Sequence, residues 1–343
     1  MNKVRIAIIG TGGISFAHGL GMLAHPDVIE CVALCDISDA SLQERSEQLG
    51  GVSHRFHDWR TMLSEVGDQF DAVVICLPHH LHSAAILDAL AAGKHVLCEK
   101  PMCIDLEDAA RIVSAVGDSG LVYMSAHNQL FFPAVQKARE LLDEGFIGKL
   151  RWVRTQDCRD IRSQFGETWR GNRELLGGGV LMDSGYHPTY LLLYFADSRV
   201  AGIRGNFARF TQKIEGEDTA SVQVRFESGM LGDILTAWGL PLPFGTFQFH
   251  LIGDKGQLFG SDDTLYFLPA GFKEPARLET PSPGSLGSTW AQSFASQMAR
   301  FVECIRGSQR PIHGAEEGYA TLEIILKSTA NAEGWQETAH LKV

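Results

Sequence analysis

The chain has 343 residues, of which 45% are hydrophobic and 21% charged, and its formal net charge at pH 7 is -11. This length favours two domains, because single cores rarely grow beyond about 250 to 300 residues, and the composition is that of a folded protein. The negative charge, without any run of Lys and Arg, argues against nucleic acid and anionic membranes as partners. The apolar stretches are too short to cross a bilayer and the start does not resemble a signal peptide, so we expect a cytoplasmic protein.

The first third of the chain alternates short apolar runs with helical stretches. The expected strands cover residues 4–9, 31–35, 72–77, 95–98 and 121–125. Strands that alternate with helices at this spacing predict a doubly wound parallel sheet. We assign this α/β domain to residues 1–125.

The pattern changes after residue 125. A helix is predicted over residues 133–142, because Pro133 suits a first helical turn and Gly145 lies just beyond the end. Alternation with a period of two predicts two antiparallel hairpins, which pair residues 219–226 with 230–237 and residues 247–252 with 257–259. Two later segments have a helical pattern and cover residues 292–305 and 315–332. Residues 126–343 are therefore expected to form an α+β domain around a large, mostly antiparallel open sheet. Residues 274–288, rich in Pro, Gly and Ser, predict a surface loop.

A glycine-rich turn follows the first predicted strand. It contains Gly10, Gly12, Gly13 and Ile14, and a helix is expected from about Ser15. Gly10 permits a tight turn, Gly12 lets the backbone approach a pyrophosphate, and the start of the helix offers free N–H groups. Ser15 stands where G-x-G-x-x-G has its third glycine and is small enough for close packing. We predict a dinucleotide site at this turn.

Asp36 ends the second predicted strand, where this fingerprint places a carboxylate for the adenosine ribose hydroxyls. It would repel a 2′-phosphate, and the next residues are Ile37 and Ser38 rather than an arginine that could bind one. We therefore expect NAD in preference to NADP. The alternative is that Asp36 only caps the next helix, a role that Ser38 could fill equally well.

Two further segments carry motifs that a glycine turn alone does not explain. The third predicted strand runs into Leu77, Pro78, His79, His80, Leu81 and His82, and the fourth runs into Glu99, Lys100 and Pro101. A later segment places Asp183 four residues before His187, behind the glycine run 177–179. With these motifs the chain resembles the Gfo/Idh/MocA oxidoreductases, of the glucose–fructose oxidoreductase or inositol dehydrogenase type, over nearly its whole length.

The resemblance implies a Rossmann domain, NAD as cofactor and hydride transfer at a secondary carbinol of a sugar, cyclitol or glycoside. It points to His187 as general acid/base and to Lys100 as the group that polarises the reacting oxygen, and Asp183 could orient the imidazole or accept a substrate hydroxyl. Asp183 and His187 would share one helical face if that segment is a helix, and Pro188 predicts a helix start or a kink there. The alternative for Lys100 is a solvated charge, and the alternative for Asp183 and His187 is a capping pair beneath a buried helix.

The resemblance also assigns further cofactor contacts to Leu77, Pro78, His79, His82, Glu99, Lys100, Asn128, Trp169 and Arg170. His79 replaces an asparagine found in many members of the family, and Phe294 stands where relatives often have a tyrosine. An exposed arginine that packs along its stem is the alternative for Arg170. Substrate contacts are expected from Lys100, Arg159, Asp160, Trp169, Asp183 and His187, with Arg162 in the same segment.

The histidines at positions 79, 80 and 82 invite a metal hypothesis, but no carboxylate or cysteine cluster at ligand spacing accompanies them, so we predict no metal. The seven cysteines are an odd number without a C-x-x-C pair and are expected to be reduced thiols.

Two other functions share these motifs. One is a glycoside-cleaving enzyme whose bound NAD is reduced and reoxidised in each cycle. The other is a dinucleotide-binding regulatory protein, in which loss of Lys100 or His187 would be expected; both are present. The resemblance also implies a homodimer or homotetramer formed through the open sheet.

Overall fold

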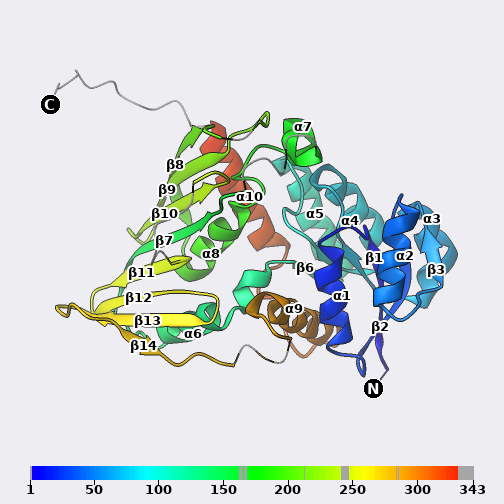
Figure 1. Ribbon diagram of the computed structural model, residues 1–343, viewed down its shortest axis with the longest axis horizontal. Coiled ribbons are helices and arrows are strands. Elements are labelled where there is room, and N and C mark those ends of the chain that lie inside the picture. Colours follow the sequence, from blue (N-terminus) through cyan, green and yellow to red (C-terminus); the bar gives the residue numbers. More distant parts are fainter. Residues whose placement is uncertain are drawn as a thin grey trace.

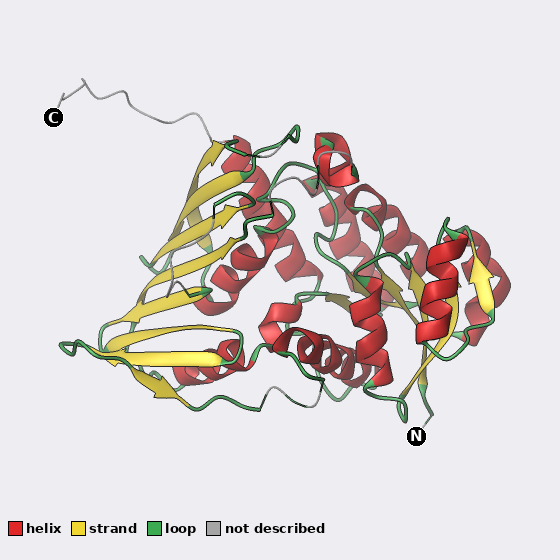
Figure 2. Ribbon diagram, in the orientation of Figure 1, coloured by secondary structure: helices red, strands yellow, loops and turns green. Residues whose placement is uncertain are grey.

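The structure is a computed structural model that describes residues 2–161, 165, 168–211, 213–240, 247–282, 284 and 286–330. Within these residues the strands form two sheets, of six and eight strands, with helices packed between and around them (Figures 1 and 2). Arg162 and the predicted helical residues beyond 330 lie outside the described residues. None of the described helices combines the length and the apolar character needed to span a membrane.

The first sheet is parallel throughout and has the strand order β3-β2-β1-β4-β5-β6. Its strands are β1 (Val4–Ile9), β2 (Ile29–Cys35), β3 (His54–Phe56), β4 (Ala72–Ile75), β5 (His95–Cys98) and β6 (Tyr123–Ser125). The connecting helices are α1 (Ser15–Leu23), α2 (Asp39–Gln48), α3 (Trp59–Val66), α4 (His82–Ala91) and α5 (Leu106–Ser119). The doubly wound parallel sheet is thus confirmed, and β3 is a short edge strand that the pattern did not predict.

The central strands are buried on both faces, which is why their sequences are continuously apolar instead of alternating. One face packs against α9 (Thr289–Ile305), whose Met298, Phe301 and Val302 share a core with Ile6 and Ile8 of β1. A helix from the last quarter of the chain therefore completes the first sheet. This helix begins three residues before its predicted start, because Ser288 caps it by accepting a hydrogen bond from the backbone N–H of Ala291.

The second sheet has the order β14-β13-β12-β11-β7-β10-β9-β8 and is antiparallel among its described strands except for the pair β7 and β10. The strands are β7 (Leu150–Cys158), β8 (Val200–Ala208), β9 (Thr219–Phe226), β10 (Leu231–Ala237), β11 (Phe249–Gly253), β12 (Gly256–Ser261), β13 (Thr264–Pro269) and β14 (Ala276–Leu278). Both predicted hairpins are confirmed. The expected loop at residues 274–288 is wrong in part, because β14 lies within it and extends the sheet by pairing with β13.

Three more helices belong to this half of the chain. They are α6 (Pro133–Asp143), with Pro133 in its first turn as predicted, α8 (Tyr186–Ala196) and α10 (Ala315–Ala330). Helices α8 and α10 lie on the side of the second sheet that faces the first domain (Figure 1). Helix α10 also contacts α5, so the two halves pack against each other closely.

Candidate functional site

The glycine turn between β1 and α1 has the geometry of a dinucleotide cradle. Gly10 has φ +89°, and a Cβ at this position would lie 2.5 Å from the carbonyl oxygen of Cys76, at the end of the neighbouring strand β4. A Cβ on Gly12 or Gly13 would meet nothing within 4 Å, so the space above the first backbone N–H groups of α1 is open. Ser15 is fully buried and its hydroxyl donates to the carbonyl oxygen of Gly12 at 2.6 Å. This turn fits a pyrophosphate.

Asp36 joins the end of β2 to the glycine turn. Its carboxylate accepts hydrogen bonds from the backbone N–H groups of Thr11 at 2.7 Å and Ser38 at 2.9 Å, one on each oxygen. The cap of α2 is Ser38, whose hydroxyl accepts from the N–H of Ser41, so the capping alternative for Asp36 is wrong. Each carboxylate oxygen retains a lone pair that a ribose hydroxyl could use.

A buried arginine lies behind the same turn and was not predicted. The Arg45 side chain is 2% exposed, and its Nε donates to the hydroxyl of Ser15 at 2.9 Å while the guanidinium lies over the ring of Phe16. Burial lowers the pKa of Arg45 from its ordinary value. Its positive charge adds to that of the α1 N-terminus beneath the expected pyrophosphate. No signal in the sequence separates Arg45 from a solvated helix residue.

Glu99 and Lys100 directly follow β5, at the carboxyl end of the parallel sheet, where the glycine turn also lies. Glu99 Oε1 lies 2.8 Å from Nε2 of His18 in α1, and both side chains are buried. Phe294 packs its ring edge-on against His18, with ring centroids 5.1 Å apart. The sequence did not predict a role for His18 at this site. Phe294 thus fills the space around His18 with an apolar ring.

Lys100, Asp183 and Arg170 form one network of charges, in which Lys100 and Asp183 are largely buried and Arg170 is partly exposed. Lys100 Nζ donates to Asp183 Oδ1 at 2.6 Å and to the backbone carbonyl of Asp183 at 3.0 Å, and Arg170 Nε donates to Asp183 Oδ2 at 2.8 Å. Burial alone would raise the pKa of Asp183, but the charges of Lys100 and Arg170 hold it well below its usual range. The carboxylate is therefore ionised at neutral pH and bridges the two cations.

His79, Trp169 and Arg170 stack in sequence beside this network. The Arg170 guanidinium lies 4.4 Å from the Trp169 ring centroid, and Trp169 packs edge-on against His79 with centroids 4.7 Å apart. His79 Nδ1 lies 2.9 Å from the carbonyl oxygen of Leu176, at the end of α7 (Arg173–Leu176). These contacts join the loop after β4 to the segment before Asp183, in agreement with their expected position near one site.

His82 braces the loop that precedes α4. Its ring nitrogens lie 2.6 Å from the carbonyl oxygen of Pro101 and 2.7 Å from that of Leu77, and the side chain is fully buried. Both nitrogens are therefore occupied by backbone contacts. Within the described part of the chain, no group of three or more His, Cys, Asp or Glu side chains is placed to hold a metal ion.

His187 lies in the first turn of α8, and Asp183 precedes that helix. The two residues do not share a helical face, because α8 begins only at Tyr186, after Asp183. Pro188 lies at the start of this helix, which is one of the two outcomes predicted for it. The ring nitrogen Nδ1 of His187 lies 2.9 Å from the hydroxyl of Tyr190. Burial lowers the pKa of His187 well below its ordinary value, and the charges of Lys100 and Arg159 add to this effect.

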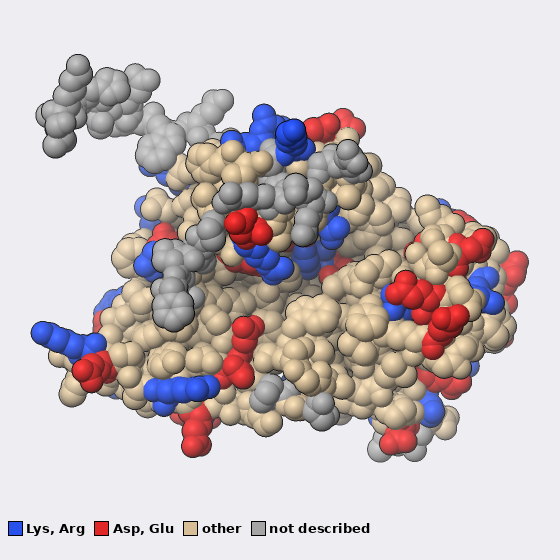
Figure 3. All heavy atoms as spheres, in the orientation of Figure 1, with Lys and Arg blue, Asp and Glu red and all other residues tan. Residues whose placement is uncertain are grey.

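The remaining expected contact residues have the following partners. Arg159 makes a two-point ion pair with Asp157, at 2.7 Å for each contact, and half of its side chain is exposed. Asp160 forms an isolated bridge with Gly239. Asn128, in a 3-10 turn after β6, donates to the hydroxyl of Ser293 at 2.9 Å. Figure 3 shows this face of the molecule hollowed near its centre, with charged side chains of both signs along the hollow.

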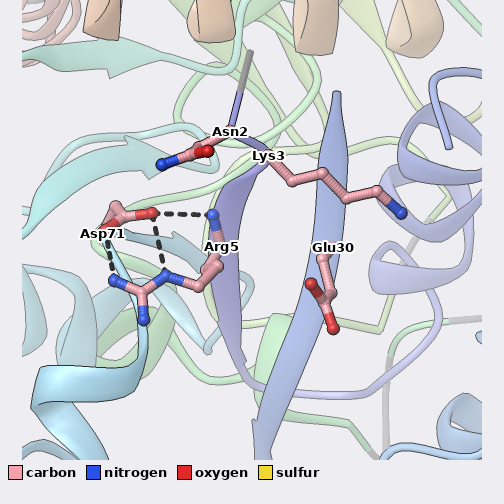
Figure 4. Close-up of a pocket in the computed structure, with 5 residues that line it drawn as sticks. All are labelled: Asn2, Lys3, Arg5, Glu30 and Asp71. Carbon is pink, nitrogen blue, oxygen red and sulfur yellow. Dashed lines mark hydrogen bonds and ion pairs between the residues drawn. The ribbon is translucent and has the colours of Figure 1, made fainter. Parts of the chain in front are cut away.

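A separate hollow of about 430 Å³ lies at the amino end of β1 (Figure 4). It is lined by Asn2, Lys3, Arg5, Glu30 and Asp71, and the ion pair of Arg5 with Asp71, at 2.8 Å, closes one side. Open parallel sheets bind ligands beyond the carboxyl ends of their strands. This hollow is at the opposite end, so it is not the candidate site.

Two family matches cover well over half of the chain. Residues 4–127 match an oxidoreductase family with an NAD-binding Rossmann fold, and residues 135–259 match the Gfo/Idh/MocA C-terminal domain. Both matched regions contain residues of the site described above, with the glycine turn and Lys100 in the first and Asp183 and His187 in the second.

The similarity to individual proteins extends over nearly the full length. The chain is 24% identical to myo-inositol 2-dehydrogenase of Thermotoga maritima, covering 93% of each chain. It is 26% identical to D-glucoside 3-dehydrogenase of Escherichia coli, covering 97% of this chain and 96% of the relative. A solved structure of levoglucosan dehydrogenase with NADH and levoglucosan has the same fold, with a TM-score of 0.86, 21% identity and 97% of each chain covered. The chain therefore belongs to the Gfo/Idh/MocA family and is an NAD(P)-dependent oxidoreductase with an NAD-binding Rossmann domain.

Proposed function

We propose that this enzyme transfers a hydride between NAD and a secondary carbinol of a sugar, cyclitol or glycoside, with Lys100 and His187 as the acid/base groups at the reacting oxygen. The observation that carries this proposal is the position of Lys100. It follows β5 at the edge of the sheet that holds the glycine turn, and its Nζ contacts Asp183 in the second half of the chain. Relatives that are named for myo-inositol and D-glucoside oxidation support the substrate class.

Oxidation of a carbinol removes a hydride from carbon and a proton from oxygen, and the nicotinamide of NAD supplies the hydride acceptor. The Lys100 ammonium has three N–H groups, and two of them are directed to Asp183. The third is available for a substrate oxygen. His187 is held near the same charges and can make a second contact to that oxygen. In oxidation the hydroxyl proton passes to Lys100 in its amine form or to neutral His187, while the Asp183 carboxylate stays ionised.

Substrate recognition is expected from the polar and aromatic side chains around this centre. Arg159 and Trp169 present a guanidinium and a flat ring, which suit the hydroxyl groups and the apolar face of a sugar or cyclitol. Asp36 favours NAD over NADP, because its carboxylate would repel a 2′-phosphate.

A panel of inositols, aldoses and glycosides tests this function. Each compound is incubated with the enzyme and NAD or NADP, and formation of reduced nicotinamide is followed by absorbance while the sugar products are identified by mass spectrometry. Oxidation of at least one compound to a ketone or lactone, with an equal amount of reduced nicotinamide, is the expected result. If no compound is oxidised and no ketose or inosose is reduced in the reverse direction, the proposal is wrong. Release of an aglycone without net reduced nicotinamide would instead identify a glycoside-cleaving enzyme that recycles its NAD.

A further inference from the structure

Tyr190 lies one turn after His187 on α8 and belongs to none of the motifs described above. Its hydroxyl is placed between two partners, Nδ1 of His187 at 2.9 Å and the backbone N–H of Gln129 at 3.3 Å. The Tyr190 side chain is fully buried, and Gln129 is buried as well. The hydroxyl therefore has a defined hydrogen-bond arrangement instead of a solvent contact.

Counting donors determines the direction of these hydrogen bonds. The N–H of Gln129 can only donate, so the phenol oxygen accepts from it. The buried phenol hydrogen also needs an acceptor, and Nδ1 of His187 is the other partner the structure gives this hydroxyl, so we take Nδ1 as unprotonated and accepting. Burial raises the pKa of Tyr190 well above its ordinary value, so the phenol keeps this hydrogen at neutral pH. A neutral His187 with Nδ1 as acceptor has its hydrogen on Nε2.

The ring of Tyr190 is held in place by its neighbours. His127 stacks on it with a centroid distance of 4.1 Å and an interplanar angle of 9°. His127 Nδ1 in turn lies 2.8 Å from Nδ1 of His313, which precedes α10. Three segments of the chain thus fix the direction in which the phenol hydroxyl points. The charged groups that act on His187 are Lys100, Arg159 and Asp183, and the rings of His127 and His313 both contact that of Tyr190.

We propose that Tyr190 is a positioning residue that holds His187 as the neutral Nε2–H tautomer, so that His187 donates a hydrogen bond to the substrate oxygen and Lys100 exchanges the proton. This inference rests on the proposed function and narrows it, because it assigns the proton transfer to Lys100 and the stabilisation of the oxygen to His187. In the reducing direction, the Lys100 ammonium gives a proton to the carbonyl oxygen as the carbon receives the hydride. In the oxidising direction, the Lys100 amine takes the proton from the hydroxyl as the hydride leaves carbon. The His187 N–H stabilises the charge on oxygen in both directions.

The tautomer can be observed directly by nitrogen NMR of protein with labelled histidine side chains, because protonated and unprotonated ring nitrogens have well separated chemical shifts. The signals of His187 among the 13 histidines are assigned with a His187→Gln variant. The test variant is Tyr190→Phe. The matched control is Tyr186→Phe, which removes another buried hydroxyl from the same helix, one that donates to the carbonyl oxygen of Gly318 at 3.1 Å.

The expected result is an unprotonated Nδ1 and a protonated Nε2 in the wild-type protein and in Tyr186→Phe, with a mixture of tautomers or a protonated ring in Tyr190→Phe. A protonated Nδ1 in the wild type, or the same signals in Tyr190→Phe as in the wild type, would overturn the inference. Neither result depends on turnover. This measurement therefore gives an answer even if the substrate panel shows that the proposed function is wrong.

With a substrate from the panel, kcat provides the second readout. Tyr190→Phe should lower kcat by about tenfold, the order of magnitude for the loss of one hydrogen bond in the transition state, and should leave the Kd for NAD unchanged. Tyr186→Phe should keep kcat within about twofold of the wild type. If Tyr190→Phe shifts the tautomer but keeps the full kcat, the positioning role is refuted.

Discussion

The carboxylate of Asp183 is shared between two cations, the largely buried Lys100 and Arg170, whose side chain is 36% exposed. Lys100 and Arg170 each contact a different oxygen of Asp183, and the side chains of Lys100 and Asp183 are 12% and 7% exposed. Removing the Asp183 carboxylate would leave Lys100 as a largely buried charge without its ionic partner, which typically costs about 3 to 5 kcal/mol. The network therefore fixes the position of Lys100 and keeps one of its N–H groups free for a substrate.

Asp36 is predicted to determine the choice of cofactor. Asp36→Asn removes the negative charge while retaining an oxygen that can accept from a backbone N–H. We expect the Kd for NAD to rise by about tenfold and the discrimination against NADP to narrow, because a charge-assisted hydrogen bond is lost and the repulsion of a 2′-phosphate is removed. Calorimetric titration with both dinucleotides measures this. The control is Asp39→Asn, a nearby carboxylate whose side chain is 91% exposed. An unchanged ratio of the two Kd values in Asp36→Asn would show that Asp36 is only structural.

At the scale of residues, the sequence identified the side chains that belong to motifs and missed those that support them. Asp36 was predicted from its place after a strand, and the structure brings Lys100 and Asp183 into contact, as the family resemblance suggested. His18, Arg45 and Tyr190 were missed. His18 contacts Glu99, 81 residues away in the sequence, and Arg45 contacts Ser15, 30 residues away. Tyr190 reaches Nδ1 of His187 because both lie in α8, which begins at Tyr186. Nothing in a helical pattern distinguishes these side chains from ordinary core or surface residues.

At the scale of elements, the turn between β1 and α1 uses its glycines for different purposes. Gly10 needs both a positive φ and the absence of a Cβ beside Cys76, whereas Gly12 has open space around its Cα. The first glycine therefore serves the fold, and we propose that the second serves the ligand. A sequence motif cannot show this difference, because both positions carry the same residue.

Two alanine variants of this turn should separate the effects. Gly10→Ala should lower the melting temperature, since a strained φ costs about 1 to 3 kcal/mol and the Cβ also clashes with a backbone carbonyl. Gly12→Ala should leave the melting temperature without cofactor nearly unchanged, and should weaken NAD binding by about tenfold or more, because its methyl group enters the pyrophosphate space. Thermal unfolding and calorimetric titration of both variants provide the measurement. The interpretation of the turn fails if Gly12→Ala is the destabilised protein or if it binds NAD as the wild type does.

Elements with a clear period or cap were predicted well, whereas the nine-residue strands β7 and β8 and the short edge strands were not predicted. The hairpin of β9 and β10 and the helix α6 were predicted to within a residue or two, because alternation and a Pro at the first turn are local signals. β3 and β14 have three residues each, and β14 lies in a stretch rich in Pro and Gly. These strands form because an edge is available for pairing, which depends on the rest of the sheet.

At the scale of the whole molecule, the last helices tie the two halves together. Helix α9 covers one face of the first sheet, and α10 packs against both α5 and α8. A division of the chain at residues 125 and 126, which remains a proposal, therefore separates the sheets in sequence but not all of the helices that cover them. The candidate site lies where the loops of the first sheet meet the segment before α8.

The outer face of the second sheet is the proposed contact between subunits. It carries the touching rings of Phe247, Phe259 and Tyr266, and Trp152 and Leu231 are 39% and 46% exposed. We propose a homodimer or homotetramer that covers this face. Light scattering should give two or four times the chain mass of 37.6 kDa, and Phe259→Glu with Tyr266→Glu should reduce the mass to that of one chain. A wild-type protein that is monomeric at micromolar concentration would contradict this.

Hydride transfer itself is tested most directly with a substrate from the panel that carries deuterium on its reacting carbon. After turnover with NAD, the account predicts deuterium on the reduced nicotinamide and a ketone or lactone product without it. Lys100→Met should bind NAD but transfer no deuterium. The control is Lys94→Met, which changes a lysine away from the site that donates to the carbonyl oxygen of Phe70, and it should transfer deuterium as the wild type does. Oxidised product without label on the nicotinamide, or undiminished transfer by Lys100→Met, would contradict the account.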